Sequence, residues 1–264
     1  MNIKIYAVSH PGKKRERNED LCLAAETIVP DGREEPTVLR KRKKDRFLVG
    51  VFDGMGGISA GDVASRLSAE TARATFEEKK DVLPPQKLLF SICEEANEQV
   101  CRKMMEEKLR MGSTASMALI EGTCCTICNL GDSPILLLRE GKLTPLYEAH
   151  NERAEYEAIN GPCDEHKKFR LTQHVGIFRV EKPIRPHIRQ IDLKRGDRLL
   201  ICSDGLSDML YMNEIEAILA GAKNGGEAVS ELLAQALERG GKDNVSILCV
   251  EMQPCKLSIF GRKK

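Results

Sequence analysis

The chain has 264 residues and a net charge of +1, because 41 lysines and arginines are balanced by 40 aspartates and glutamates. This balance excludes a global attraction to DNA, RNA or an anionic membrane, so any charge specificity must be local. The sequence has neither an apolar run of about 18 residues nor an N-terminal apolar core, so we expect no membrane span and no secretion.

The first part of the chain predicts two strands and a long connection. Residues 3–8 alternate as a strand does and precede a polar loop at 9–20, and residues 21–25 form a second short strand. The polar stretch 30–45 contains two prolines and the basic run 40–44. We interpret it as a hairpin connection whose basic run is a solvated loop rather than a docking patch.

The next elements are a buried strand and two helices. The apolar run 47–52 is typical of a strand covered on both faces, and it leads directly to Asp53. Apolar residues at helical spacing then predict helices at about 61–78 and 86–109.

The second half of the chain returns to strands. Predicted strands are 113–120, 124–130, 135–138, 184–193, 198–203 and 245–250; predicted helices are 213–219 and 227–238. Residues 150–169 have a weak pattern and are interpreted as an irregular or partly helical insertion. Because the strands do not alternate regularly with helices, the pattern favours an α+β, mainly antiparallel layered fold. We expect one domain over residues 1–252 and a tail at 253–264.

The ten cysteines fall mainly in apolar runs, so we expect buried, reduced thiols and a cytoplasmic protein. Cys125 and Cys128 form a C-x-x-C spacing, but no second pair accompanies them. Zinc ligation there is therefore disfavoured against a place in the core.

Three aspartates carry the functional hypothesis. Asp53, Asp204 and Asp243 each adjoin an apolar strand and turn-forming residues, so their carboxylates can project into a common cleft. Each taken alone is more typical of an ordinary turn. The repetition at the ends of three strands favours a shared site.

Further acids, Glu19, Asp20 and Asp132, bring the number of loop carboxylates to at least six, with no matching His or Cys cluster. Hard oxygen ligands select Mg²⁺ or Mn²⁺ rather than zinc. Two such ions about 3.5–4 Å apart can share a hydroxide aimed at phosphorus, which predicts hydrolysis of a phosphate ester. Arg15 can hold the phosphate through its planar fork, although a solvated loop residue is the simpler interpretation.

The order of the motifs resembles the PPM-type metal-dependent protein phosphatases, also called the protein phosphatase 2C family, in its bacterial form. The resemblance covers nearly the whole chain. The matching segments are Gly12-Lys13-Lys14-Arg15-Glu16-Arg17-Asn18-Glu19-Asp20, Phe52-Asp53-Gly54-Met55-Gly56-Gly57, Gly61 with Ala64-Ser65, Gly112-Ser113-Thr114-Ala115, Asn129-Leu130-Gly131-Asp132-Ser133, Ser203-Asp204-Gly205-Leu206-Ser207-Asp208 and Asp243-Asn244.

The resemblance implies a four-layer αββα sandwich with two Mn²⁺ or Mg²⁺ ions at one end of the central sheets. It assigns Asp53 as the bridge between the ions and Gly54 as a carbonyl ligand. It implies the remaining roles residue by residue: Asp204 and Asp243 hold one ion, Glu19 approaches the other through water, Asp20 is a further carboxylate of the site, Arg15 binds the phosphate, and Asp132 and Asp208 bind a third, weaker ion with Asp204.

Several positions depart from the family pattern. They are His10, Ile58, Pro134, Ala149-His150-Asn151 and the segment Leu171-Thr172-Gln173-His174-Val175-Gly176. None removes a ligand, and together they make the stretch 149–176 the divergent, substrate-facing part. Met55 stands where some relatives carry a histidine, so a metal-bound water is preferred as general acid over His150 or His174.

The resulting hypothesis is an enzyme that hydrolyses phosphoserine and phosphothreonine in proteins, opposing a serine/threonine kinase and acting as a monomer. Within the same chemistry, a regulatory phosphatase acting on anti-sigma-factor antagonists is a second candidate. A catalytically silent phosphoprotein-binding module of the same fold is the alternative from another class. The sequence leaves open the phosphoprotein substrate and the metal used in the cell.

Overall fold

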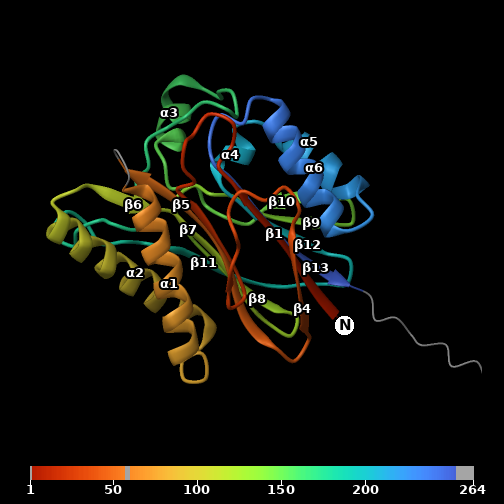
Figure 1. Ribbon diagram of the computed structural model, residues 1–264, viewed down its shortest axis with the longest axis horizontal. Helices are drawn as coiled ribbons and strands as arrows, with labels where there is room; N and C mark the ends of the chain where they lie inside the picture. The colour runs from red at the N-terminus through yellow and green to blue at the C-terminus, as the bar shows by residue number, and fades with distance from the viewer. Residues whose placement is uncertain (1, 57–59, 254–264) are drawn as a thin grey trace, which may run out of the picture.

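The computed structural model describes residues 2–56 and 60–253, and two antiparallel sheets lie face to face at its centre (Figure 1). The six-stranded sheet has the order β10 (Lys142–Pro145), β9 (Ile135–Arg139), β12 (Arg198–Cys202), β13 (Val245–Gln253), β1 (Asn2–His10) and β4 (Thr37–Arg42). The seven-stranded sheet has the order β11 (His187–Asp192), β8 (Cys124–Leu130), β7 (Ala115–Glu121), β5 (Arg46–Gly56), β2 (Asp20–Ala24) and β3 (Thr27–Ile28), with β6 (Met111–Ser113) paired to β5.

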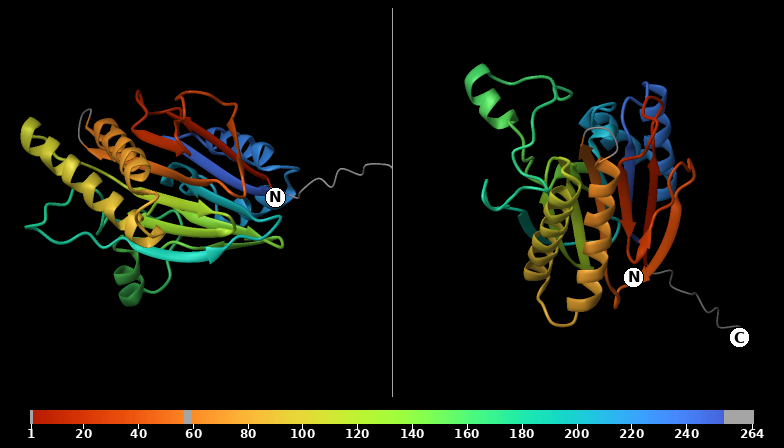
Figure 2. Two further views of the ribbon diagram at one scale, coloured as in Figure 1. Left: turned by 90° about the horizontal axis from the view of Figure 1, so that it is seen from below. Right: turned by 60° about the vertical axis from the view of Figure 1, so that its left-hand side comes forward.

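Helices cover the outer face of each sheet, as the views in Figure 2 show. The helices are α1 (Gly61–Lys79), α2 (Pro85–Glu107), α3 (Arg153–Asn160), α4 (Asp204–Ser207), α5 (Met212–Gly221) and α6 (Gly225–Glu238). α1 and α2 pack on the seven-stranded sheet, and α5 and α6 pack on the other. The predicted α+β sandwich of four αββα layers is therefore confirmed.

Strand alternation divides the apolar residues among three core layers. On β5, Phe47, Val49 and Val51 face the other sheet, whereas Leu48 and Phe52 face α1 and α2. The expectation of a strand covered on both faces is thus confirmed. By the same alternation, Asp53, the residue after Phe52, faces the space between the two sheets.

β5 is longer than the sequence indicates. The apolar run ends at Phe52, but the strand continues to Gly56, so Asp53 lies within a strand and not after its end. Thr114 explains the continuation, because its backbone N–H donates to Asp53 O (2.8 Å) and its hydroxyl accepts from Asp53 N (3.0 Å). The same residue interrupts the predicted strand 113–120, because it separates Ser113, the last residue of β6, from β7.

The hairpin interpretation of residues 30–45 is wrong for the stretch 37–42. These residues form β4, which pairs with β1 along the edge of the six-stranded sheet. The basic side chains misled the prediction, because an edge strand tolerates charge where a central strand does not. Arg40 and Arg42 are exposed, and Lys41 pairs with Glu26 across 2.8 Å.

The insertion after β10 has the partly helical character that the sequence indicates. It contains α3, none of whose residues is buried, and this helix projects from the body of the molecule in Figure 2. The short helix α4 is an element that the sequence analysis missed, since four residues are too few to show a period.

Some expectations lie beyond the described residues, namely those for Gly57, Ile58 and the stretch 254–264 of the tail. In the described part of the chain, no helix combines the length and apolar character that crossing a bilayer requires. Cys125 and Cys128 belong to different core layers, so their thiols do not face a common ion, and both are free.

Candidate metal centre

Two carboxylates lie directly opposite each other on neighbouring strands. Asp20 on β2 pairs in register with Asp53 on β5, and both occupy positions that alternate toward the space between the sheets. Like charges in a cross-strand pair repel each other. Asp20 is 8% exposed, and its Oδ2 atom is buried without a hydrogen-bond partner among the described residues. This pair therefore calls for a proton or an added cation.

Glycines bring the backbone of the opening loop against β5. A Cβ on Gly54 would lie 2.1 Å from Gly61 O and 2.4 Å from Glu19 O, so no side chain fits there. Gly54 N also donates to Glu19 O across 3.1 Å. The carboxylate of Glu19 accepts from the backbone N–H of Gly61, at the start of α1. Glu19 is thus fixed beside Gly54.

A second group of acids, the loop carboxylates Asp204, Asp208 and Asp243, lies in the turn around α4 and in the loop before β13. Asp204 begins α4 directly after β12, and Asp208 follows the same turn, its N–H donating to Asp204 O across 2.7 Å. Asp243 precedes β13. Gly205 permits the close approach of these segments, since a Cβ there would lie 1.9 Å from Asn244 O.

Asn244 connects this second group to the opening loop. Its side-chain oxygen accepts from Glu19 N (2.9 Å), and its amide nitrogen donates to Pro11 O (2.9 Å) and Arg17 O (2.8 Å). Asn244 is 4% exposed, so these bonds are shielded from water. Asn244, the residue after Asp243, therefore holds both Glu19 and the loop that carries Arg15 in place.

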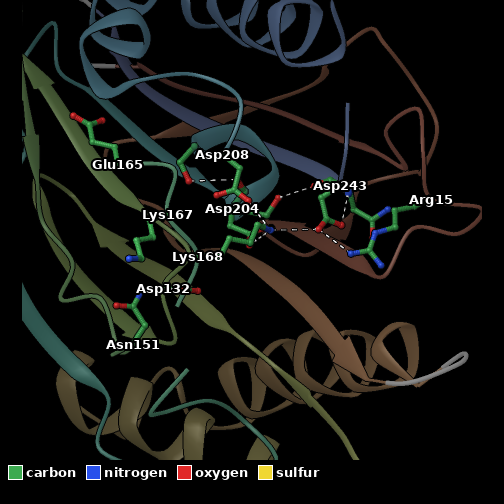
Figure 3. Close-up of polar contacts among 12 residues, drawn as sticks. Arg15, Asp132, Asn151, Glu165, Lys167, Lys168, Asp204, Asp208 and Asp243 are labelled. Atoms are coloured by element: carbon green, nitrogen blue, oxygen red, sulfur yellow. Dashed lines mark hydrogen bonds and ion pairs between the residues drawn. The ribbon is translucent and has the colours of Figure 1, made fainter. Parts of the chain in front are cut away.

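Two cationic side chains reach the loop carboxylates (Figure 3). Arg15 Nη2 donates to Asp243 Oδ2 across 2.9 Å. Lys168 Nζ lies 2.6 Å from Asp208 Oδ2, 3.5 Å from Asp204 Oδ2 and 3.8 Å from Asp243 Oδ2. The loop carboxylates are thus compensated by positive charges of the chain itself.

Asp132 contacts the divergent stretch that follows β10. It follows β8, and its Oδ2 accepts from Asn151 Nδ2 across 3.1 Å. A cavity of about 340 Å³ opens here; its lining includes Asp132, Asp204, Asp208 and, from the insertion, Arg153 and Lys168.

Burial shapes the electrostatics of the cluster. It raises the pKa of Asp20 to about 7, with the negative charge of Asp204 adding to the rise. Burial also raises the pKa of Asp204 to about 7, against the opposing effect of Lys168. The pKa of Asp53 is raised well above its usual range by burial and then by Asp20. These groups cannot all be ionised at neutral pH unless cations join them.

Burial also raises the pKa values of two acids at the edge of the cluster, Glu19 and Asp132. For Glu19, the Gly61 N–H and Arg15 oppose this rise in pKa. For Lys168, burial lowers the pKa, but the carboxylates of Asp204 and Asp208 outweigh it and the net shift is upward.

The donor set fits a hard divalent cation. The acids of the cluster offer carboxylate oxygens, one of which is buried and without a partner among the described residues. Among residues 2–56 and 60–253, no three acid, histidine or cysteine side chains already enclose a position for an ion. Arg15 contacts Asp243 and Lys168 lies nearest to Asp208, so an ion at either of these carboxylates competes with a cation of the chain itself.

The divergent positions have structural partners. His10 Nδ1 accepts from Gly12 N (3.0 Å), and His150 Nδ1 accepts from Gly131 N (3.2 Å). His174 contacts Val175 O through Nδ1 at 2.9 Å. Burial lowers the pKa of His150 and of His174, so both rings favour the neutral form. Pro134 O accepts from Cys202 N across 3.1 Å, which joins β12 to the Asp132 turn.

The structure brings all nine predicted positions to one end of the two sheets. Sequence reasoning missed Lys168 and the connecting role of Asn244. The motif Asp243-Asn244 offers a signal for Asn244, since an amide beside a ligand can cap a loop. Lys168 has no such signal, because it lies in an insertion without periodicity.

The family model for protein phosphatase 2C matches residues 37–246 of the chain. A serine/threonine phosphatase named stp from Listeria welshimeri is 30% identical over 225 residues, which cover 80% of this chain and 86% of the relative. The solved Mycobacterium tuberculosis serine/threonine phosphatase PstP/Ppp is 27% identical, with a TM-score of 0.73 and coverage of 96% and 100%. A structure of the PstP catalytic domain in complex with two manganese ions gives a TM-score of 0.75 at 26% identity, with the same coverage.

Proposed function

Because the chain belongs to the protein phosphatase 2C family, we propose that it hydrolyses phosphoserine and phosphothreonine in proteins with the help of two Mn²⁺ or Mg²⁺ ions. The observation that supports this most directly is the pair formed by Asp20, which is buried, and Asp53, which is half-buried. Two acids face each other on adjacent strands, and one buried oxygen has no partner among the described residues. An added divalent cation stabilises that arrangement.

Each acid has a proposed place in the centre. Asp53 holds both ions, Gly54 contributes its carbonyl, and Asp204 and Asp243 hold one ion. Glu19 supports the other ion through water, with Asp20 beside it. Asp132 and Asp208 would complete a third, weaker position next to Asp204 if Lys168 left the Asp208 side open. When bound, the ions supply an activated water for attack on phosphorus and neutralise phosphate charge.

Arg15 binds the phosphate of the substrate in this proposal. Its side chain is 51% exposed, and it contacts Asp243 through Nη2, so the guanidinium has other N–H groups that can donate to a phosphate. A planar guanidinium donates two parallel hydrogen bonds to a phosphate, which positions phosphorus for in-line attack.

The leaving alkoxide takes its proton from water. Met55 has no proton to donate, and the contacts of His150 and His174 are with the backbone. Both histidines favour the neutral form because burial lowers the pKa of each. A structural role for these two residues therefore accounts for their surroundings.

The test is phosphate release from p-nitrophenyl phosphate and from a phosphothreonine peptide with Mn²⁺. We expect Asp204→Ala to lower kcat/KM by at least about 10²-fold, and a chelator to abolish release. Asp81→Ala, which changes an exposed acid far from the cluster in sequence, serves as the control and should keep full activity.

A catalytically silent phosphoprotein-binding module is the alternative. It is disfavoured because every carboxylate that the family pattern requires is present. Wild-type protein that binds Mn²⁺ by calorimetry, binds the phosphopeptide and releases no phosphate would overturn the enzyme proposal and support the module.

We further propose that the substrates are phosphoproteins of the cytoplasm and that a serine/threonine kinase opposes the enzyme, which acts as a monomer. The nine described cysteines are all free thiols, which suits a reducing compartment. Phosphoproteomics of a deletion strain, complemented either with wild type or with Asp204→Ala, identifies the substrates as the sites that only the active form changes.

A further inference from the structure

Lys168 places an ammonium group inside the loop carboxylates, where a bound cation would be stabilised. Its Nζ atom lies within 4 Å of Asp208, Asp204 and Asp243, and the shortest of these contacts, to Asp208 Oδ2, is 2.6 Å (Figure 3). Three carboxylates around one ammonium leave the group net negative. The contact is therefore a counterion arrangement and not an isolated surface pair.

The backbone immediately before Lys168 is held in place by contacts of residues 165–167. Arg153 donates to Glu165 O (2.7 Å) and Lys167 O (3.0 Å), which fixes the chain immediately before Lys168. At the tip of the insertion, Glu165 Oε2 accepts from Met212 N across 3.1 Å at the start of α5. The ring of His166 stacks on that of Tyr211 at 4.0 Å. The chain next to Lys168 is thus held against α5, and the Lys168 side chain, which is 62% exposed, extends from there to the carboxylates.

The neighbouring lysine shows that the contact depends on position. Lys167 Nζ lies 3.6 Å from the centre of the Tyr156 ring and 5.7 Å from that of Phe169, so it packs on the aromatic side of the insertion. No ion pair joins Lys167 to the acids of the cluster within the described part of the chain. Two adjacent lysines of the same charge and length therefore have different partners.

We propose that Lys168 is an internal counterion that excludes a divalent ion from the Asp208 side of the centre and so determines how many ions the protein holds. A divalent ion on Asp208 Oδ2 and an ammonium at hydrogen-bond distance from the same oxygen repel each other strongly. Only one of them can occupy the position. With Lys168 in place, the protein holds two ions and uses its own lysine instead of a third.

This inference rests on the proposed function, because it takes Asp204 and Asp208 to be ion ligands. The test is equilibrium dialysis of the metal-free, full-length protein against Mn²⁺, with Lys168→Met, Lys168→Arg and Lys167→Met as variants. We expect wild type, Lys168→Arg and Lys167→Met to bind two ions. Lys168→Met should bind one more ion at the same free Mn²⁺, with an affinity for it at least about tenfold higher than in wild type.

A second substitution locates the additional ion. Asp208→Asn in the Lys168→Met background should return the number of ions to two, and thermal melting of each variant shows whether it is folded. Equal ion numbers in wild type and Lys168→Met, or three ions already in wild type, would overturn the inference and leave the proposed function intact. Absence of bound Mn²⁺ from every folded variant would overturn both.

Discussion

The carboxylates on the strands and the carboxylates on the loops compensate their negative charge differently. Asp20 and Asp53 sit on paired strands between the sheets, with a buried oxygen that lacks a partner among the described residues. Asp204 and Asp208 lie in the turn around α4, Asp243 lies in the loop before β13, and the three receive Lys168 or Arg15. Strands hold their side chains rigidly, whereas loops let long cationic side chains approach. The strand pair therefore depends most on an added ion.

The largest effect is expected from the strand pair. Asp53→Asn should lower kcat/KM by at least about 10³-fold, because it removes the carboxylate that would hold both ions in the proposed centre. The metal-free variant should at the same time be more stable than wild type, since the repulsion from Asp20 is lost. Phosphate-release kinetics and urea unfolding in a chelator measure the two effects. A less stable metal-free variant would contradict this account of the pair.

The pH dependence of metal-free stability comes next. The pKa of Asp20 is about 7 in the folded state, above the value of about 3.9 for an exposed aspartate. The folded state therefore keeps a proton that the unfolded chain loses, and the free energy of unfolding falls as pH rises through this window. We expect a loss of about 2–4 kcal/mol from this group between about pH 4 and pH 7, and little change above it.

Urea unfolding in a chelator across that pH range measures this loss. Mn²⁺ should remove most of it, because the ion binds the deprotonated carboxylates of the folded state. Asp20→Asn should show a smaller fall with pH than wild type, the remainder coming from Asp53 and Asp204, whose pKa values are also raised. An unchanged fall in Asp20→Asn would show that this carboxylate is not the group responsible.

The smallest of the three effects concerns the loop region. Arg15→Ala should raise KM about tenfold through loss of the phosphate contact. It should change stability by less than about 1 kcal/mol, because the pair with Asp243 is half exposed. Lys14→Ala, an exposed cation of the same loop, should leave both quantities unchanged. Equal KM values for the two variants would remove Arg15 from phosphate binding.

The sequence predicted most of the fold because the apolar pattern is strong where strands and helices are buried. The run 47–52 identified the central strand β5, and the helical spacing identified α1 and α2. It failed for residues 37–42, which form an edge strand, because pairing with β1 and not burial makes that strand. It also failed for Thr114, whose bonds to Asp53 interrupt one strand and extend another.

By itself, the sequence determined which acids belong to the candidate centre, since motif order and residue type are properties of the chain alone. Tertiary structure decided how their charges are compensated. The opposition of Asp20 and Asp53 depends on strand register, and the arrival of Lys168 depends on how an aperiodic insertion folds back against α5. Electrostatic energy depends on distance and burial in space, and neither quantity is encoded in local spacing along the chain.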